Sequence, residues 1–450
     1  MIGQVAQKKI YLFVTLLLYA VSIIVMGYFL PRTESLLQLV FYALAFTSYL
    51  IICHFSKSGL LSIKSGIAWS MILRMLLLFA VPVLSDDFYR FIFDGHLIKM
   101  GLSPYMLLPD EAVQEANLIK EGYWETLIQG MNSRNYYSIY PPLHQVFFWM
   151  AAWGGSNLFA NILILRLVIL IFEVLNFFFL YKIIKAWGLS AYRLWLYTFN
   201  PLVILELTGN LHFEGLVLTG LLSVLYFFGQ KRLIHSAMGW IWGVGVKLTP
   251  LMLGPLMVFS WGKEDRQKFL WVAVILIFIA FWPLLLQENL LHFWQSFRLY
   301  QSKFEFNASI YYLIRWLSGF FVDYNPIAYV GPILNGLAFA IILSIGLFRK
   351  PENGKEMADA MGWIYLCFLL LQTVVHPWYI IPAFGVSVLT QNRIFLWWTG
   401  LVFLSYSAYS DEFRVNENQI VILLEYGALA GFFFWNYLKR FKSRNLEFKI

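Results

Sequence analysis

Long apolar stretches recur along the whole chain and are separated by short polar segments. The clearest of them cover residues 10–30, 36–52, 163–181, 216–228, 269–286 and 421–435. A helix needs about 20 consecutive apolar residues to cross the hydrocarbon core of a bilayer, and several of these runs approach that length. Together with the weaker runs between them, the pattern predicts an all-α polytopic transmembrane helical bundle of about 12 to 14 segments that cross or re-enter the membrane.

The composition supports a membrane protein. Of the 450 residues, 60% are hydrophobic and 13% are charged, and the mean hydropathy is +0.67. So few charges cannot cover the surface of a soluble protein of this size. Cys53 and Cys367 lie inside apolar runs, where we expect small hydrophobic side chains and no disulfide. The net charge of +8 fits basic residues gathered in cytoplasmic loops, so no nucleic-acid partner is expected.

The positions of the basic residues predict the orientation of the chain. Lys8 and Lys9 precede the first apolar run, which places the N-terminus in the cytoplasm by the positive-inside rule. Every second connection carries basic residues: Lys57 and Lys64; Lys182, Lys185 and Arg193; Lys231 and Arg232; Lys263, Arg266 and Lys268; Arg349, Lys350 and Lys355; Arg393; and Lys439, Arg440, Lys442 and Arg444. The short opposite connections hold few, with one arginine in residues 31–35. Both chain ends are therefore predicted to be cytoplasmic.

Two connections on the predicted outer side are long, covering residues 83–157 and 287–325. Long connections in a compact fold tend to carry function, because rigid helices position the loops that bind and react. No tandem repeat or soluble domain is visible, so residues 1–450 are expected to form one membrane domain. We expect its active site at these two extracytoplasmic loops.

Two short apolar stretches, residues 234–246 and 248–260, break the spanning pattern. Each is about 20 Å long as a helix, which is short of a core of about 30 Å. Lys247 and Pro250 lie where the two stretches meet. A broken helix with a cation at membrane depth is tolerated where it lines a cavity or is buried against protein, so the junction is a candidate site.

Acidic residues open the first long connection. Asp86, Arg90 and Asp94 are spaced four residues apart, so on one helix Arg90 can lie between two carboxylates. A carboxylate held ionised at the membrane surface can act as a general base. The alternative is structural: Ser85 caps a helix whose first turn holds Asp86 and Asp87. The spacing alone leaves both interpretations open.

Further polar residues fall on the same predicted side. They are Tyr140 with His144, His212 with Glu214, and His376 with Tyr379. Tyrosines of this kind are typical of the membrane interface and are compatible with a sugar site. His212 and Glu214 must face a polar cavity or each other, because either is unfavourable in lipid. A lone histidine such as His376 more often has no role in function. It is a candidate site residue because these residues are predicted to converge on one face.

Two charged residues, Arg74 and Glu173, lie near the middle of apolar runs. An unpaired charge there is unfavourable by about 2.5–3.5 kcal/mol on insertion scales. We therefore expect the two side chains to pair across neighbouring helices for a structural reason.

Signatures of metal and nucleotide binding do not occur in the sequence. It has no HExxH, no Cys/His cluster, no Walker motif and no GxGxxG. No tightly bound cofactor is expected, and the metal requirement is open. The energy for a reaction would therefore have to come from an activated donor substrate and not from a nucleotide bound by this chain. A membrane lipid is the natural carrier of such a donor.

Five strings, in order, carry a family resemblance. They are SDDFYRFIFDGHLIKMGLSPY from residue 85, YPPLH from 140, NLHFEG from 210, VKLTP from 246 and HPWY from 376. They resemble blocks of the GT-C superfamily, in particular bacterial polyprenyl-phosphate-dependent mannosyltransferases and the related eukaryotic GPI mannosyltransferases. The strings span residues 85–379, most of the chain. Each string alone is weak, and the set is more specific for the family than for the substrate.

The resemblance implies an inverting glycosyltransferase of the bacterial inner membrane. Such an enzyme moves a single sugar, most often mannose, from a polyprenyl-phosphate carrier to a glycan or glycolipid hydroxyl on the extracytoplasmic side. The acidic motif of the family falls on Asp86, the better match for the base, and on Asp87. Relatives often have Trp or an aromatic-rich run before the Asp-Gly pair where this chain has Phe93, which puts the acceptor site in doubt.

The remaining site residues divide into two expected roles. A leaving phosphate needs positive charge more than a proton. The residues expected to bind the donor phosphate are Lys247 and His376, from the family blocks, with Arg298 and Arg315 as further cations. The residues expected to bind the substrate are Arg90, Asp94, Tyr140, His144, His212, Glu214 and Tyr379.

Other functions remain compatible with the sequence. A transporter or flippase of lipid-linked sugars would also use broken helices and a basic residue at depth, although no inverted repeat is visible. An oligosaccharide ligase or polymerase would share the donor chemistry. A purely structural subunit would leave Asp86, Asp87, Lys247 and His376 individually replaceable.

Overall fold

The computed structural model describes residues 2–115, 122–411 and 414–447, and within them the chain is helical. The strand-like pairing in this described part is one isolated parallel bridge between Phe306 and Val374. The prediction of an all-α membrane protein is confirmed. Residues 116–121, in the first long connection, lie outside the described residues.

Five helices of the described chain are long and apolar enough to cross a membrane. They are α1 (Ile2–Tyr28), α2 (Ser35–Lys57), α8 (Leu158–Ala186), α14 (Lys263–Phe281), which continues into η4 (Trp282–Leu285), and α17 (Ile327–Phe348). Large apolar side chains on their outer faces are exposed, as at Ile171, Trp271 and Phe339. Lipid is the solvent that suits such surfaces.

A sixth apolar element is a bent pair of helices, which forms either a broken span or a re-entrant loop. The segment Pro201–Gly209, made of α10 (Pro201–Val203) and the π-helical η2 (Ile204–Gly209), meets α11 (Glu214–Phe228) at 119°. Almost every residue of α11 is buried, so this helix is the centre of the bundle. Gly220 allows α12 (Leu233–Val246) to approach closely, because a Cβ there would lie 2.6 Å from the carbonyl oxygen of Gly239.

The other apolar runs form shorter helices. They are α12, η3 (Thr249–Leu253) with α13 (Gly254–Phe259), α20 (Ile394–Leu401) with η6 (Val402–Tyr409), and residues 419–435 of α21 (Gln419–Glu447). These shorter helices end where Pro, Gly and 3-10 or π turns interrupt apolar runs that are buried inside the bundle. Length and composition identify spanning helices and not re-entrant segments, so the number of 12 to 14 crossing or re-entrant segments stays a prediction.

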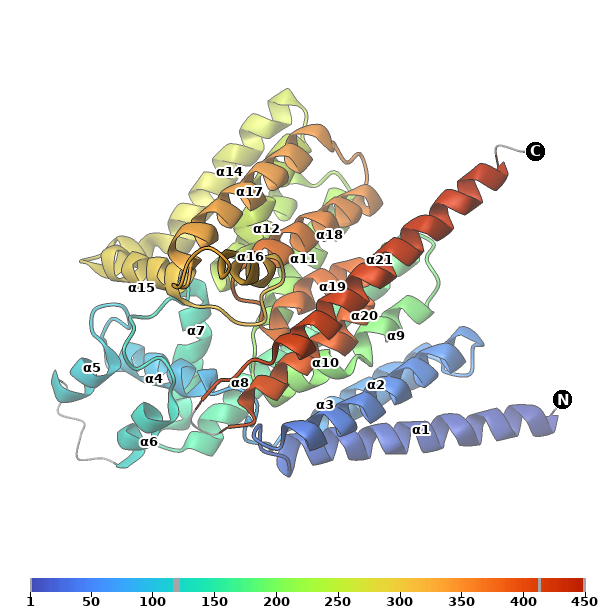
Figure 1. The fold of residues 1–450 in the computed structure, drawn as a ribbon, viewed down its shortest axis with the longest axis horizontal. Helices are drawn as coiled ribbons and strands as arrows, with labels where there is room; N and C mark the ends of the chain where they lie inside the picture. Colours follow the sequence, from blue (N-terminus) through green and yellow to red (C-terminus); the bar gives the residue numbers. More distant parts are fainter. Residues whose placement is uncertain (1, 116–121, 412–413, 448–450) are drawn as a thin grey trace.

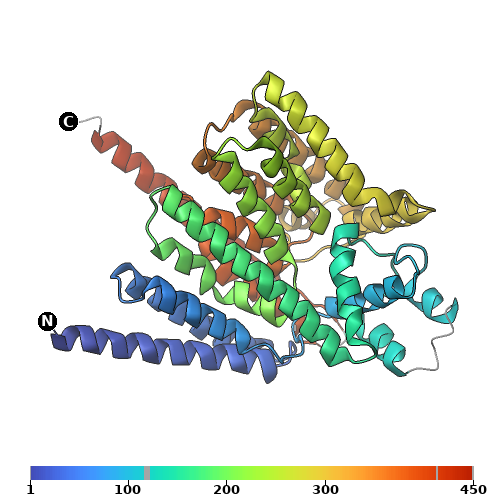
Figure 2. The ribbon, with the colours of Figure 1, turned by 180° about the vertical axis from the view of Figure 1, so that it is seen from behind.

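The remaining helices connect and close the bundle. They are α3 (Ile63–Met75), α4 (Asp87–Lys99), α5 (Pro109–Glu115), α6 (Gly122–Gly130), α7 (Pro142–Ala151), η1 (Ala152–Gly154), α9 (Tyr192–Thr198), α15 (Asn289–Lys303), α16 (Ile310–Ser318), α18 (Gly354–Leu371), η5 (Pro377–Ile380) and α19 (Ile381–Ser387). Helices α4, α5, α6 and α15 lie at one end of the molecule, and both chain termini lie towards the other (Figures 1 and 2). The two long connections thus gather at one end of the bundle.

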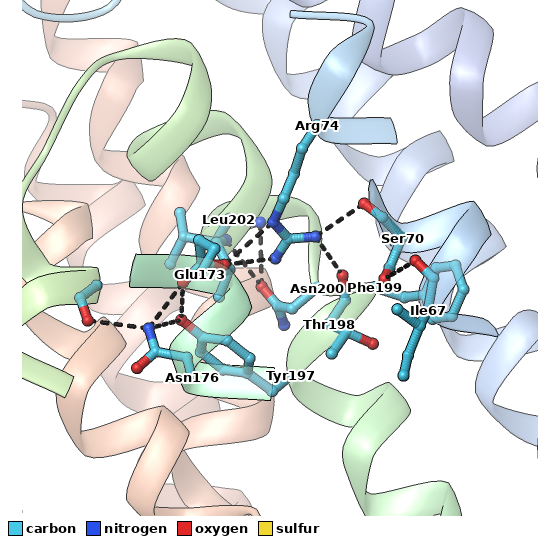
Figure 3. A network of polar contacts seen from close by, with 12 residues as sticks. Ile67, Ser70, Arg74, Glu173, Asn176, Tyr197, Thr198, Phe199, Asn200 and Leu202 are labelled. Carbon is cyan, nitrogen blue, oxygen red and sulfur yellow. Dashed lines mark hydrogen bonds and ion pairs between the residues drawn. The ribbon is translucent and has the colours of Figure 1, made fainter. Parts of the chain in front are cut away.

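A buried polar network ties three helices together (Figure 3). Arg74 of α3 donates to Glu173 of α8 at 2.7 Å, and neither side chain is exposed, which confirms that the two charges pair. Arg74 also donates to the carbonyl oxygen of Thr198 at 2.8 Å. The second carboxylate oxygen of Glu173 accepts from the Tyr197 hydroxyl at 2.7 Å and from Asn176 at 2.9 Å. Both charges are therefore surrounded by partners, as burial in an apolar environment requires.

Candidate active site

A cavity of about 430 Å³ lies between α4, α7, α15 and the buried centre of the bundle. Ten residues singled out from the sequence line it: Asp86, Asp87, Arg90, Tyr140, His144, His212, Glu214, Lys247, His376 and Tyr379. They come from five stretches that are up to 293 positions apart, from 86 to 379. The fold therefore brings the motifs of the sequence to one place.

Asp86 and Asp87 stand at the start of α4. The helix begins at Asp87, and Asp86 occupies the N-cap position without a side-chain capping bond. The Ser85 hydroxyl accepts from the backbone N–H of Asp87 at 3.3 Å, but Asp86 and not Ser85 occupies the N-cap position, which corrects the structural alternative. Because neither carboxylate forms a side-chain cap at this helix end, both are left to face the cavity.

The partner of Asp86 is Arg32, a residue that the sequence did not single out. Their side chains form a 2.7 Å ion pair, with 31% and 29% of the Arg32 and Asp86 side chains exposed. Arg32 comes from the connection between α1 and α2 and lies over the ring of Tyr409 at 5.4 Å. Its only signal in the sequence is that it is the single basic residue of a short connection predicted to be outside.

Arg90 does not lie between two carboxylates, which corrects the prediction from spacing. It donates to Asp94 at 2.6 Å, and it also donates to the carbonyl oxygens of Ser133 and Tyr136. The i, i+4 geometry fails for Asp86 because that residue precedes the helix, so its side chain does not follow the helical face.

Asp94 is fully buried and is not among the residues that line the cavity. Its second oxygen accepts from Ser138 at 2.6 Å and from Gln145 at 2.9 Å. Together with Arg90, it ties α4 to residues 133–138 and to α7. Asp94 therefore does not face the cavity, and its contacts hold residues that form the cavity wall.

Asp87 has an unusual acidity. The pKa of its carboxyl is raised to about 6, mainly by burial; the Lys247 ammonium and the Asn132 side chain oppose this rise, and the nearby carboxylates of Asp86 and Glu214 add to it. A carboxyl with this pKa is ionised at neutral pH yet basic enough to accept a proton.

Lys247 lies where the helix breaks, as the sequence predicted. Its backbone is extended between α12 and η3, and its ammonium group pairs with Glu214, the first residue of α11. The ammonium nitrogen lies 4.4 Å from the centroid of the Tyr379 ring. Among the described residues, Lys247, Arg32 and Arg90 are the Lys and Arg side chains that line the cavity.

His212 and Glu214 do not face each other. Glu214 pairs with Lys247, whereas His212 lies 3.5 Å from Glu206 and stacks on Trp378 with ring centroids 3.7 Å apart. His376 also stacks on Trp378, at 4.5 Å. These rings form an aromatic wall of the cavity.

Burial lowers the pKa of His376 to about 3, and the Lys247 ammonium adds to the effect. The imidazole is therefore neutral at physiological pH. It offers a hydrogen-bond donor and an acceptor to a ligand and carries no positive charge. Tyr379 beside it hydrogen-bonds Tyr300 of α15 at 2.6 Å, which closes the cavity on that side.

Two of the expected cations lie elsewhere. Arg315 pairs with Glu305 at 2.5 Å and is 45% exposed, and Arg298 is exposed on α15. Neither lines the cavity. Within the described part of the chain, no group of three or more His, Cys, Asp or Glu side chains is placed to hold a metal ion.

Comparison with known proteins identifies the family. The family described as "Alpha-(1->6)-mannopyranosyltransferase, N-terminal domain" matches residues 14–263. This chain belongs to that family, of the GT-C type. The matched range holds Arg32, both aspartates, Glu214 and Lys247, but not His376 or Tyr379.

Two curated relatives carry the name Alpha-(1->6)-mannopyranosyltransferase A. The protein from Mycobacterium tuberculosis is 24% identical over 329 residues, which cover 67% of this chain and 61% of the relative. The protein from Corynebacterium glutamicum is 26% identical over 192 residues, which cover 41% of this chain and 36% of the relative. The chain thus spans less than two thirds of the length of either relative. No solved structure matches it significantly.

Proposed function

We propose that this protein is an inverting mannosyltransferase that takes one mannose from a polyprenyl-phosphate carrier and passes it to an acceptor hydroxyl. The observation that carries the proposal is the placement of Asp87, with its pKa raised to about 6, in a cavity that also holds the Lys247–Glu214 ion pair. A base and a cation for a departing phosphate are the two groups that such a transfer requires.

The reaction is a single displacement. The acceptor oxygen forms a bond to the anomeric carbon of mannose while the bond from that carbon to the phosphate oxygen breaks. The ionised Asp87 takes the proton of the acceptor hydroxyl. The bonding electrons leave with polyprenyl phosphate, whose new negative charge is stabilised by Lys247.

The choice of Asp87 over Asp86 rests on electrostatics. The carboxylate of Asp86 is already engaged in an ion pair with Arg32. Asp87 has the pKa that general-base catalysis at neutral pH favours. We assign Asp86 and Arg32 the role of positioning the substrate at the N-terminal end of α4.

The names of the relatives extend the proposal to the substrates. An α-(1→6) product made with inversion requires a β-linked mannosyl donor and the primary 6-hydroxyl of an acceptor sugar. The positive-inside pattern supports a cavity on the extracytoplasmic side of the bacterial inner membrane and termini in the cytoplasm. The neutral His376 and the aromatic wall suit a sugar ring, which presents hydroxyl groups and an apolar face.

The test is transfer of radiolabelled mannose from polyprenyl-phosphate mannose to an α-mannoside in membranes that contain equal amounts of each variant. Asp87→Asn should lower transfer by about 100- to 10,000-fold, the range of general-base contributions. Asp86→Asn should retain much more activity. Asp110→Asn, in the same long connection but paired with Arg134 at the surface, is the matched control and should behave as wild type.

Two outcomes would contradict the proposal. Undiminished transfer by Asp87→Asn would remove Asp87 from catalysis. An absence of transfer by the wild-type protein with any lipid-linked sugar, combined with movement of such a lipid across the bilayer, would favour a flippase.

A further inference from the structure

A second cavity, of about 540 Å³, lies far from the candidate active site. It is bounded by the start of α9, the connection between α17 and α18, and the connection between α19 and α20. These segments lie towards the end of the bundle that carries both chain termini (Figure 1). Its volume falls within the roughly 300–1,000 Å³ that is common for small-molecule sites.

The lining of this cavity is basic. It holds four cations and two carboxylates, namely Arg193, Arg349, Lys350, Lys355, Glu356 and Asp359. Asp359 is neutralised by Arg349 at 2.7 Å. Glu356 accepts from the backbone N–H of residue 352 at 2.9 Å and from Asn353 at 2.7 Å, which fixes it at the start of α18. The cavity therefore keeps a surplus of positive charge.

One of the cations is rigidly placed. Arg193 is buried, and one nitrogen of its guanidinium group donates to the carbonyl oxygens of Val388 at 2.7 Å and Thr390 at 2.6 Å. The planar guanidinium is thereby held at the wall of the cavity. By contrast, Lys350 and Lys355 are exposed, and neither forms an ion pair with a carboxylate of the described residues. Both ammonium groups can turn towards a ligand.

The surface beside the cavity is apolar and exposed. Phe348, the last residue of the apolar helix α17, is 84% exposed and directly precedes Arg349 and Lys350. Leu337, about three turns earlier on the same face of this helix, is 48% exposed. The anionic group of a ligand bound at the lysines would therefore lie among the cations. The apolar part of that ligand would contact the apolar surface of α17.

We propose that this cavity binds the phosphate group of an anionic phospholipid from the leaflet at the terminal side of the protein. Arg193, Lys350 and Lys355 contact the phosphate, and the acyl chains lie along α17. Basic pockets between membrane helices on the cytoplasmic side recognise anionic headgroups in this way. The exposed Phe348 favours a lipid over a soluble phosphate. The inference does not depend on the proposed transferase activity.

The test uses the purified full-length protein in detergent, titrated with short-chain phosphatidylglycerol, short-chain phosphatidylcholine or inorganic phosphate. Thermal unfolding and native mass spectrometry report binding. Phosphatidylglycerol should bind saturably and raise the unfolding temperature, and phosphatidylcholine should not. The double variant Lys350→Gln/Lys355→Gln should bind phosphatidylglycerol about 30-fold more weakly, the loss expected for two surface cations.

The matched control is Lys64→Gln/Lys263→Gln, which removes two exposed lysines from connections predicted to lie on the same side, outside this cavity. The control should bind like wild type, and all three proteins should unfold at the same temperature without lipid. Equal phosphatidylglycerol binding by all three would overturn the proposal. Protection by inorganic phosphate alone, lost in the cavity variant, would support the phosphate site and assign it to a soluble ligand. Lys350→Glu provides a second, stronger variant.

Discussion

The carboxylate of Asp86 and the guanidinium group of Arg32 form a 2.7 Å ion pair although 54 positions separate them in the sequence. This contact gives two adjacent aspartates different environments, because only Asp86 pairs with Arg32. Asp86 is paired with its own cation, whereas burial is the main influence on Asp87 and raises the pKa of its carboxyl to about 6. Environment, and not residue type, separates the two carboxyl groups.

The first prediction concerns the pH dependence of transfer. Asp87 accepts a proton only when it is ionised, so protonation below its pKa removes the base. The kcat/KM of mannose transfer should therefore fall about tenfold per pH unit below about pH 6 and be level above it. An aspartate with the ordinary pKa of 3.8 would leave the rate level down to about pH 4. A profile that stays flat to pH 5 would contradict the assignment.

The second prediction concerns variants that shift the pH at which kcat/KM falls, the acid limb of the profile, in opposite directions. The charge of Asp86 raises the pKa of Asp87, so Asp86→Asn should shift the limb to lower pH. Arg32→Gln leaves Asp86 without its cation and should shift the limb to higher pH, in each case by up to about one pH unit. The measurement is the pH profile of kcat/KM for each variant, with Asp110→Asn as the control that leaves it unchanged. Shifts in the same direction would refute this coupling.

The third prediction concerns stability. Arg74→Met leaves Glu173 buried without its cation, so the free energy of unfolding should fall by about 3–5 kcal/mol. Arg134→Met breaks the exposed pair with Asp110 and should change it by at most about 1 kcal/mol. Thermal unfolding in detergent compares the two. Because Arg74 also donates to the Thr198 carbonyl oxygen, exchanging the charges of Arg74 and Glu173 should restore stability only in part. Equal unfolding temperatures for Arg74→Met and wild type would contradict a structural role.

The fourth prediction concerns the packing of α4 on α7. A Cβ at Gly95 would lie 1.9 Å from the carbonyl oxygen of Phe148, so the two helices must separate in Gly95→Ala. The expected loss of stability is about 1–3 kcal/mol. Transfer should also fall, since α4 carries Asp87. Gly122→Ala, where no atom lies within 4 Å of the added Cβ, is the control. Wild-type stability and transfer in Gly95→Ala would show that the contact tolerates a methyl group.

Several features of this protein could be predicted from the sequence because each rests on a local rule. The helix break at Lys247 follows from two apolar runs too short to span a membrane. The Arg74–Glu173 pair follows from the free-energy penalty of a lone charge in an apolar run. The membrane class follows from composition, and the family follows from five short strings in a fixed order.

Other features could not be predicted, because they depend on where distant segments meet. No pattern joins Arg32 to Asp86, and no pattern shows that Arg298 and Arg315 lie outside the cavity. The same holds for Asp94, whose helical spacing suggested a site residue and whose partners, Ser138 and Gln145, are 44 and 51 positions away. The sequence did not show which of the other apolar runs form continuous helices, because a buried helix can break wherever neighbouring helices satisfy its backbone.

By itself the sequence determined that this chain is a helical membrane protein with acidic, basic and aromatic groups gathered on one side. Those properties follow from hydrophobicity and charge, which act residue by residue along the chain. Only the tertiary structure decided which carboxylate is paired, which is left with a raised pKa, and which cation reaches the cavity. The physical reason is that burial and Coulomb interactions depend on distances between side chains, and packing of segments far apart in the chain sets those distances.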